Sequence, residues 1–205
     1  MRPRGLAAAA VVLVIAGCGD QRDERRDPRP AVLQVSAGGE VATAFALGPG
    51  ELVTVAHILG HRAAGATVRL QSGRRATIRA VDERDDLALL AVPGLRATRA
   101  ALDPAARGTA SVLVLRRSRV RALPATIRRA ITATIRTPDG RRVVRRPALE
   151  LRADVEPGDS GAPVVTPDGR IAGVVFAQSD AREHIAYAVR VSALGARLRR
   201  PADRS

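Results

Sequence analysis

Residues 156–165, EPGDSGAPVV, have the composition of a loop that carries a nucleophile. Ser160 stands directly before Gly161 and two residues after Gly158, and an apolar run follows. Gly158 allows the backbone to turn an N–H group inward, and Gly161 leaves room for a substrate carbonyl beside the Ser160 hydroxyl. The N–H groups of Gly158 and Ser160 would then form an oxyanion hole. The alternative is a structural turn, because Gly, Asp and Ser favour turns of any kind.

Residues 52–59, LVTVAHIL, form an apolar segment that ends near His57. The end of a buried strand is a rigid support, which a general base requires. A single histidine in such a place also occurs as a purely structural residue, so its interpretation depends on the other segments. His61 and His184 lie in polar, loop-like sequence and are the weaker candidates for a base.

Residues 81–92, VDERDDLALLAV, contain the acid that we expect to reach the interior. Asp86 directly precedes an apolar run that must be buried. A buried carboxylate needs a polar partner, and His57 would supply one. The alternative is that Asp86 only caps a strand. The other acids of the segment are expected in a solvated turn: Asp82, Glu83 and Asp85.

Strands are the elements that must position these residues. Apolar and polar residues alternate at period two, as in residues 131–136 (ITATIR), which is typical of half-buried strands. The string TPDGR occurs at 137–141 and again at 166–170 and predicts a reused hairpin turn. Residues 95–108 break the alternation and would connect two halves, and only residues 191–199 have a helical pattern. The sequence therefore predicts an all-β protein in two halves.

Composition limits the classes of function. The 205 residues are 46% hydrophobic, which is enough for a sizeable core. The single cysteine, Cys18, excludes an intramolecular disulfide framework and a zinc site built on paired cysteines. The formal charge of +14 comes entirely from arginine, with no lysine, which indicates a coding bias rather than phosphate binding. With three aromatic residues there is little to stack on bases, so no nucleic-acid partner is expected.

The N-terminal segment predicts a location outside the cytoplasm. Residues 6–16 form an apolar run after two arginines; this run is too short to span a bilayer and typical of a secretory signal. Small residues before Cys18 resemble a bacterial lipoprotein signal, which implies that residues 1–17 are removed and Cys18 is acylated. Residues 18–30 are rich in charge and proline and would be a flexible tether. The alternative is an ordinary signal peptide cut nearby.

The order His57, Asp86, Ser160, each at the edge of an apolar strand, resembles the trypsin-like (chymotrypsin-fold) serine peptidases. The similarity is greatest to the disulfide-free bacterial members, the periplasmic heat-shock proteases and membrane-anchored relatives linked to acid or oxidative stress. It implies two six-stranded β-barrels, with the site between them, and a short C-terminal helix. The implied peptidase domain is residues 31–205, with the first barrel at about 31–95, the second at about 108–190 and the helix at about 191–199.

The resemblance also implies roles for the site residues. His57 would be the general base and then the general acid, Asp86 would fix its tautomer and stabilise the imidazolium, and Ser160 would attack. The N–H groups of Gly158 and Ser160 would receive the oxyanion. No metal or organic cofactor is implied, because the three histidines are scattered and the acids lack ligand spacing.

Two positions of the loop depart from the family. Ala162 stands where a second glycine is usual, which adds one methyl group but leaves the oxyanion donors in place. In activated animal members the acid before the nucleophile pairs with a newly cut N-terminus. That route is not expected here, so Asp159 would need an arginine or a backbone group as its partner.

The residue preference at the cut site is predicted from one position. Asp154 lies six residues before Ser160, where the animal family has the floor of its specificity pocket, and a carboxylate there would favour Arg or Lys before the cut. The alternative is that loop lengths differ and Asp154 faces solvent. Phe176 and Tyr187, on the strand beside the substrate and on the last barrel strand, would complete the pocket.

These observations predict a serine endopeptidase that hydrolyses peptide bonds of extracytoplasmic proteins through an acyl-enzyme. Its partners would be a polypeptide substrate and the membrane that holds the lipid on Cys18. A second hypothesis is a catalytically silent, peptidase-like lipoprotein that binds peptides or a partner protein by strand addition. A third is a basic lipoprotein that binds the cell wall or anionic lipid.

Overall fold

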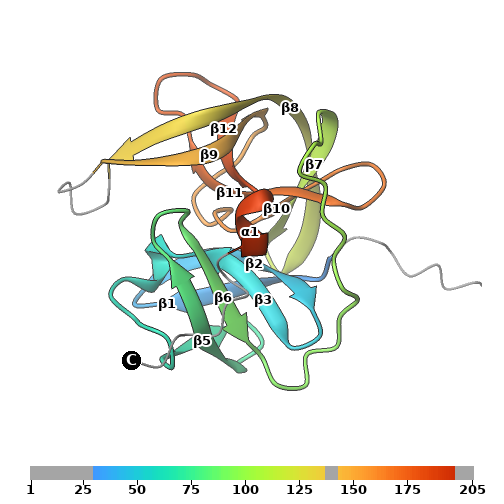
Figure 1. The fold of residues 1–205 in the computed structure, drawn as a ribbon. Coiled ribbons are helices and arrows are strands. Elements are labelled where there is room, and N and C mark those ends of the chain that lie inside the picture. The colour runs from blue at the N-terminus through green and yellow to red at the C-terminus, as the bar shows by residue number, and fades with distance from the viewer. Residues whose placement is uncertain (1–29, 137–142, 197–205) are drawn as a thin grey trace, which may run out of the picture.

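The computed structural model describes residues 30–136 and 143–196, and their strands form two closed barrels of six strands each (Figure 1). In the first barrel the strands follow the order β1-β2-β3-β6-β5-β4. Their bounds are β1 Val32–Ala37, β2 Glu40–Gly48, β3 Glu51–Val55, β4 Thr67–Leu70, β5 Arg75–Asp82 and β6 Leu87–Ala91. A short 3₁₀ helix, η1, follows β3 at His57–Leu59.

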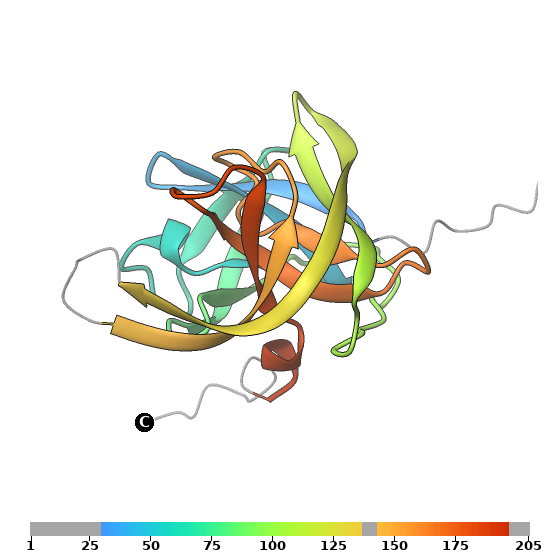
Figure 2. The same ribbon diagram turned by 90° about the horizontal axis from the view of Figure 1, so that it is seen from above.

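The second barrel lies above the first in Figure 1 and has the order β10-β11-β12-β9-β8-β7. Its strands are β7 Gly108–Arg116, β8 Arg119–Arg136, β9 Val143–Arg152, β10 Pro163–Val165, β11 Ile171–Gln178 and β12 Ile185–Arg190. The longest of them, β8, curves along the side of this barrel with β9 beside it (Figure 2). The prediction of an all-β fold with two six-stranded barrels is therefore confirmed.

A short helix, α1, closes the described chain at Ser192–Ala196, which confirms the predicted C-terminal helix. Residues 197–199, which were predicted to belong to this helix, lie outside the described residues. The same holds for the predicted signal peptide, for nearly all of the tether and for the first TPDGR string. The second string is the β10–β11 turn, where Gly169 has φ +81° and Thr166 N donates to Arg170 O at 2.9 Å. Within the described residues no helix is long and apolar enough to cross a membrane.

The alternating apolar residues form the barrel interiors. Phe45 and Leu90 are fully buried in the first barrel, and Leu151 is fully buried in the second. The core of the first barrel continues across the junction, since Val174 of β11 and Leu194 of α1 belong to the same cluster of packed side chains. The two barrels therefore share a packed junction. The segments that carry His57, Asp86 and Ser160 end in loops beside it.

Candidate active site

The imidazole of His57 is held by the carboxylate of Asp86. His57 begins η1 directly after β3, and Asp86 directly precedes β6, which pairs with β3 so that Val55 lies opposite Leu87. His57 Nδ1 lies 2.8 Å from Asp86 Oδ2, and the His57 backbone N–H donates to Asp86 Oδ1 at 2.8 Å. Two hydrogen bonds from one residue thus fix both oxygens of the carboxylate. Asp86 is only 7% exposed, whereas 32% of the His57 side chain is exposed, so the carboxylate is buried behind a ring that reaches the surface.

The charge state of His57 is set by burial and by three neighbours. Burial opposes the charged imidazolium, but the hydrogen bond and the negative charge of Asp86 outweigh it, so the pKa of His57 is raised above its ordinary value. The positive charge of Arg146 lowers this pKa, and Glu40 raises it. Because Nδ1 faces Asp86, the nitrogen left to accept a proton from a nucleophile is Nε2.

The loop of residues 156–162, called the Ser160 loop below, joins β9 to β10 through consecutive turns. Asp159 N donates to Glu156 O at 3.0 Å, and Ala162 N donates to Asp159 O at 2.9 Å. Gly158 and Gly161 have φ of +95° and +88°, which L-residues with side chains rarely adopt. The turn at Gly158 agrees with the backbone geometry predicted there, whereas the positive φ of Gly161, which was predicted to leave room for a substrate carbonyl, is a second backbone requirement of this loop.

The Ser160 loop is seated on the first barrel. Thr43 of β2 donates its N–H to Ser160 O at 2.8 Å and its hydroxyl to Gly158 O at 3.0 Å. Thr54 of β3 donates its hydroxyl to Thr43 O at 2.8 Å. A Cβ on Gly161 would lie 1.9 Å from Thr43 O, so only glycine permits this close approach. The loop is thereby fixed to β2, which Thr54 joins to β3, the strand that leads into His57.

Sequence reasoning missed both threonines. Thr43 and Thr54 are 1% and 0% exposed although each lies in an otherwise apolar run. A hydroxyl in the middle of a buried strand needs a hydrogen-bond acceptor, and this was the available signal. It does not name the partner, which comes here from another part of the fold.

The seated loop leaves two backbone donors unpaired. Among the described residues, neither the N–H of Gly158 nor that of Ser160 has a hydrogen-bond partner. These are the two groups that the sequence predicts for an oxyanion hole. No hydrogen bond joins the Ser160 hydroxyl to the His57 ring within the described parts of the chain. Catalytic hydrogen bonds of this kind are often long before substrate binds and tighten in the substrate complex.

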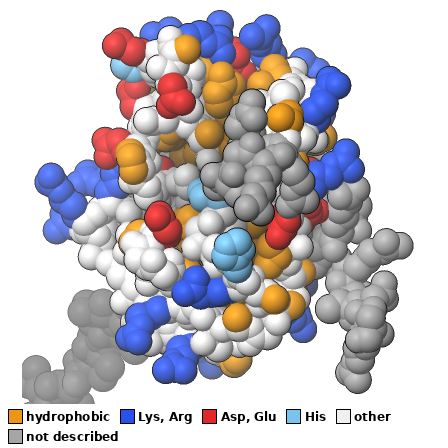
Figure 3. Space-filling view, turned by 90° about the vertical axis from the view of Figure 1, so that its left-hand side faces the viewer, with side chains coloured by type: hydrophobic (Ala, Val, Ile, Leu, Met, Phe, Trp, Pro, Cys, Tyr) orange, Lys and Arg blue, Asp and Glu red, His pale blue; other side chains and the backbone are white. Residues whose placement is uncertain are grey.

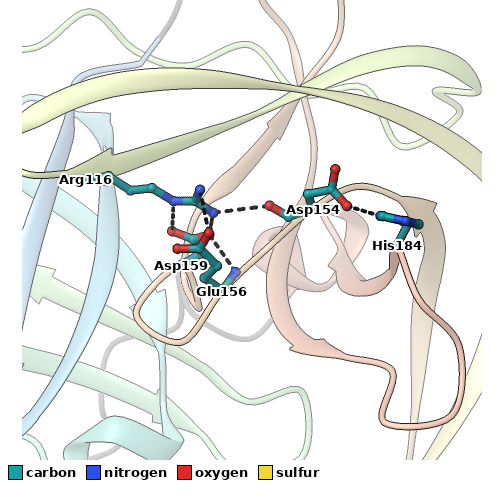
Figure 4. A network of polar contacts seen from close by, with 5 residues as sticks. All are labelled: Arg116, Asp154, Glu156, Asp159 and His184. Atoms are coloured by element: carbon teal, nitrogen blue, oxygen red, sulfur yellow. Dashed lines mark hydrogen bonds and ion pairs between the residues drawn. The ribbon is translucent and has the colours of Figure 1, made fainter.

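Asp159 is held by an arginine and by the backbone, as the sequence predicted (Figure 4). Arg116, the last residue of β7, donates from Nη2 to Asp159 Oδ2 at 2.5 Å and from Nε to Oδ1 at 3.3 Å. It also contacts Glu156 Oε1 at 3.1 Å and the carbonyl of Asp154 at 3.1 Å. The Glu156 N–H completes the coordination of Asp159 Oδ2 at 2.8 Å. One guanidinium therefore joins two residues of the Ser160 loop, Glu156 and Asp159, to Asp154 just before it.

A hollow of about 330 Å³, partly open to solvent, lies beside Ser160. Its lining is Val155, Glu156, Pro157, Ser160, Val175, Ala177 and Gln178. Asp154 is not part of this lining. Its carboxylate is exposed and is bound to His184, on the far side of the Asp154 backbone from Arg116 (Figure 4). The only carboxylate in the lining is that of Glu156, which is paired with Arg116.

Phe176 and Tyr187, the other residues predicted for the pocket, are also not part of this lining. Their rings stack with centroids 6.4 Å apart, and the Arg146 guanidinium lies 5.2 Å from the centre of the Phe176 ring. Arg146 Nη1 in turn lies 3.2 Å from Asp86 Oδ2. Sequence reasoning missed Arg146, because nothing in the sequence distinguishes it among 34 basic residues.

The surface charge is dispersed on the face shown in Figure 3. Blue arginine side chains lie at the edge and in the lower middle of this face with red carboxylates among them, and orange apolar side chains are spread between them. Among the described residues, no group of three or more His, Cys, Asp or Glu could hold a metal ion.

Two six-stranded β-barrels with a histidine–aspartate pair and a glycine-rich serine loop at their junction define the trypsin-like class of peptidase domains. The family of the Trypsin-like peptidase domain matches residues 42–174, and the chain belongs to this family. It is 37% identical over 145 residues to the serine proteases Rv3671c and MT3772 of two Mycobacterium tuberculosis strains, H37Rv and CDC 1551. The alignment covers 65% of this chain and 35% of those proteins, so the chain spans about a third of their length.

Solved structures support the same assignment. The active form of the Rv3671c protease is similar with a TM-score of 0.73 and 26% identity, over 87% of this chain and 82% of that one. An inactive form of the same protease gives a TM-score of 0.69 and 29% identity, over 83% and 88%. A serine endoprotease from Yersinia pestis shares the fold, with a TM-score of 0.59 and 18% identity, over 80% of this chain and 60% of that one.

Proposed function

We propose that this chain is a serine endopeptidase that cleaves polypeptides with Ser160, His57 and Asp86. The observation that carries the proposal is the seating of the Ser160 loop on Thr43, next to the strand that ends at the His57–Asp86 pair. That seating brings a serine and a hydrogen-bonded histidine, 103 residues apart in the chain (160 minus 57), to the same barrel junction. A binding protein would have no need for the carboxylate behind the histidine.

The reaction follows from this arrangement. Ser160 Oγ attacks the substrate carbonyl carbon while His57 Nε2 takes the hydroxyl proton, and the oxyanion forms beside the N–H groups of Gly158 and Ser160. The C–N bond then breaks, the leaving amine takes the proton from His57, and an ester on Ser160 remains. Water attacks this ester with His57 again as base, which releases the acid and restores the serine. Throughout, Asp86 holds Nδ1 and stabilises the imidazolium.

The direct test is mass spectrometry of the protein after incubation with an unfolded polypeptide. New internal fragments that are absent with the Ser160→Ala variant would support the endopeptidase. An intact polypeptide after incubation with folded protein, over a range of pH, would contradict it.

The cut sites in the same experiment test the pocket. Its walls are mostly apolar, with Val155, Val175 and Ala177 among them, and Asp154 lies outside the lining. An Arg or Lys side chain would lose hydration there without gaining a free carboxylate. We therefore expect cleavage after aliphatic residues to exceed cleavage after Arg or Lys by about tenfold or more.

Asp154→Asn is the matched variant for this expectation. Its cut-site profile should equal that of the wild type, because its carboxylate is bound to His184 at the surface. Cuts that cluster after Arg or Lys and are lost in Asp154→Asn would overturn the expectation and make Asp154 the specificity residue.

We also propose that the domain acts outside the cytoplasm and is anchored to the membrane by a lipid attached to Cys18. The support is the sequence alone: an apolar run too short to span a bilayer, followed by small residues and a single cysteine. Incorporation of an alkyne-labelled fatty acid that Cys18→Ser abolishes is the expected result. Labelling that is unchanged in Cys18→Ser, or absent from the expressed wild type, would contradict the anchor.

A further inference from the structure

Arg146 is a buried cation next to the carboxylate that holds the histidine. It lies on β9 between two exposed residues, Arg145 and Pro147, yet it is only 5% exposed itself. Its Nη1 is 3.2 Å from Asp86 Oδ2, but neither Nη1 nor Nε makes a hydrogen bond to any described residue. The contact is therefore an ion pair without hydrogen-bond geometry. Burying a guanidinium with unpaired donors is costly, and proteins retain such costs most often at functional sites.

Arg146 reaches the His57–Asp86 pair of the first barrel from the second barrel. Asp86 belongs to the first barrel, and Arg146 is carried by β9 of the second. Phe176 of β11 lies against the guanidinium at 5.2 Å, and Tyr187 of β12 stacks on Phe176. A cation on an aromatic face is stabilised without being neutralised, so its charge remains available to act on the neighbouring carboxylate.

Three charged groups act on the charge of His57, each from a different element. Asp86 precedes β6 and both bonds and attracts the imidazolium, Glu40 of β2 attracts it, and Arg146 of β9 repels it. Arg146 is thus the cation that limits how strongly the two acids favour the protonated ring. A general base works only while it is unprotonated, so this repulsion extends its working range toward lower pH.

We propose that Arg146 is a positioning residue that fixes the Asp86 carboxylate against His57 and sets the acid end of the pH range in which His57 acts as a base. The role in activity rests on the proposed function. Oδ2 of Asp86 is shared between His57 Nδ1 and Arg146 Nη1, while Oδ1 takes the His57 N–H. The guanidinium therefore holds the oxygen that orients the ring.

The test is the pH profile of kcat/KM for Arg146→Met and Arg146→Gln, which remove the charge but keep much of the side-chain length. We expect the acid limb of both variants to move upward by about half a pH unit to one unit. Arg146→Lys retains a cation, so the acid limb of its pH profile should lie close to that of the wild type. Arg145→Met is the matched control, because it removes an equal charge from the adjacent, exposed position of the same strand.

The salt dependence of the pH profile distinguishes the effect of the buried charge of Arg146 from that of the exposed charge of Arg145. Any small shift in Arg145→Met should vanish at about 0.5 M salt, whereas the shift in the Arg146 variants should persist, because a buried pair is poorly screened. A limb that stays in place in both neutral Arg146 variants, even if their melting temperatures fall, would show a purely structural role and overturn the proposal.

A second measurement does not depend on turnover. NMR titration of the His57 ring in the Ser160→Ala background should show the same upward shift when Arg146→Met is added.

If removing the arginine alone prevents folding, the comparison is made in Asp86→Asn, where no buried carboxylate is left unpaired. Adding Arg146→Met should raise the His57 midpoint there as well, and an unchanged midpoint refutes the proposal. Should the wild type cleave nothing, the proposed function fails, while this titration still decides the role of Arg146.

Discussion

Replacing Ser160 by alanine is expected to reduce kcat for a polypeptide substrate by about 10⁶-fold, and His57→Ala by a similar factor. The serine and the histidine act as one unit: without the hydroxyl there is no acyl-enzyme, and without the base the hydroxyl keeps its proton. The double variant should therefore be no slower than either single variant. Any residual rate would come from the unpaired N–H groups of Gly158 and Ser160 and from substrate binding alone.

A fluorophosphonate probe measures the same groups without a substrate. The wild type should form a covalent adduct on Ser160, and both single variants should lose it. Matched controls are Ser36→Ala on β1 and His61→Ala, whose side chains lie outside the site and which should label like the wild type. Labelling that survives in Ser160→Ala would identify a different nucleophile.

The same probe decides between the enzyme and a silent binding protein. A folded wild type that neither labels nor cleaves, but binds peptides, would establish the second hypothesis of strand addition at the barrel junction. A third outcome, salt-sensitive binding to anionic vesicles that neither substitution changes, would favour the basic lipid-binding protein.

Local patterns in the sequence predicted the strands and the three candidate residues of the site. Period-two alternation predicted strands because one side of each strand faces a barrel interior. Gly158 predicted a special backbone, which its positive φ of +95° shows, and Gly161, which was predicted to leave room for a substrate carbonyl, also has a positive φ of +88°. The partner of Asp159 was also predicted by type, as an arginine or a backbone group, from the resemblance to the peptidase family. The inferences on the strands and on the glycines use neighbours within a few positions in the chain.

The residues that escaped prediction act across long sequence separations. Thr43 meets the Ser160 loop 117 residues later in the chain (160 minus 43), and Arg146 meets Asp86 across 60 residues (146 minus 86). Such contacts depend on how two barrels pack, and no local pattern encodes that packing. Arginine is also the commonest charged residue here, so a single buried one has no distinguishing composition. The structure was needed to identify which arginine holds which acid.

Arg116→Met is expected to lower kcat/KM by about 10²-fold, mainly through kcat. Asp159 is 3% exposed, and among the described residues Arg116 provides its only side-chain cation. Without the guanidinium, the buried carboxylate keeps the Glu156 N–H as its one partner in residues 30–136 and 143–196, and it is drawn toward solvent. Asp159 lies between the N–H groups of Gly158 and Ser160, so its displacement moves both donors of the expected oxyanion hole. The loss of a single such donor costs about 10²- to 10³-fold in kcat.

Comparison of variants separates this effect from general destabilisation. Arg116→Lys keeps the charge but cannot form the two-pronged contact, so its activity should fall between that of Arg116→Met and the wild type. Arg119→Met removes an exposed arginine across the same hairpin and should retain full activity. Fluorophosphonate labelling should slow in parallel with kcat at a temperature where circular dichroism shows each variant folded. Full activity in a folded Arg116→Met would mean that the Glu156 N–H alone holds Asp159, and that the guanidinium stabilises the loop without placing its donors.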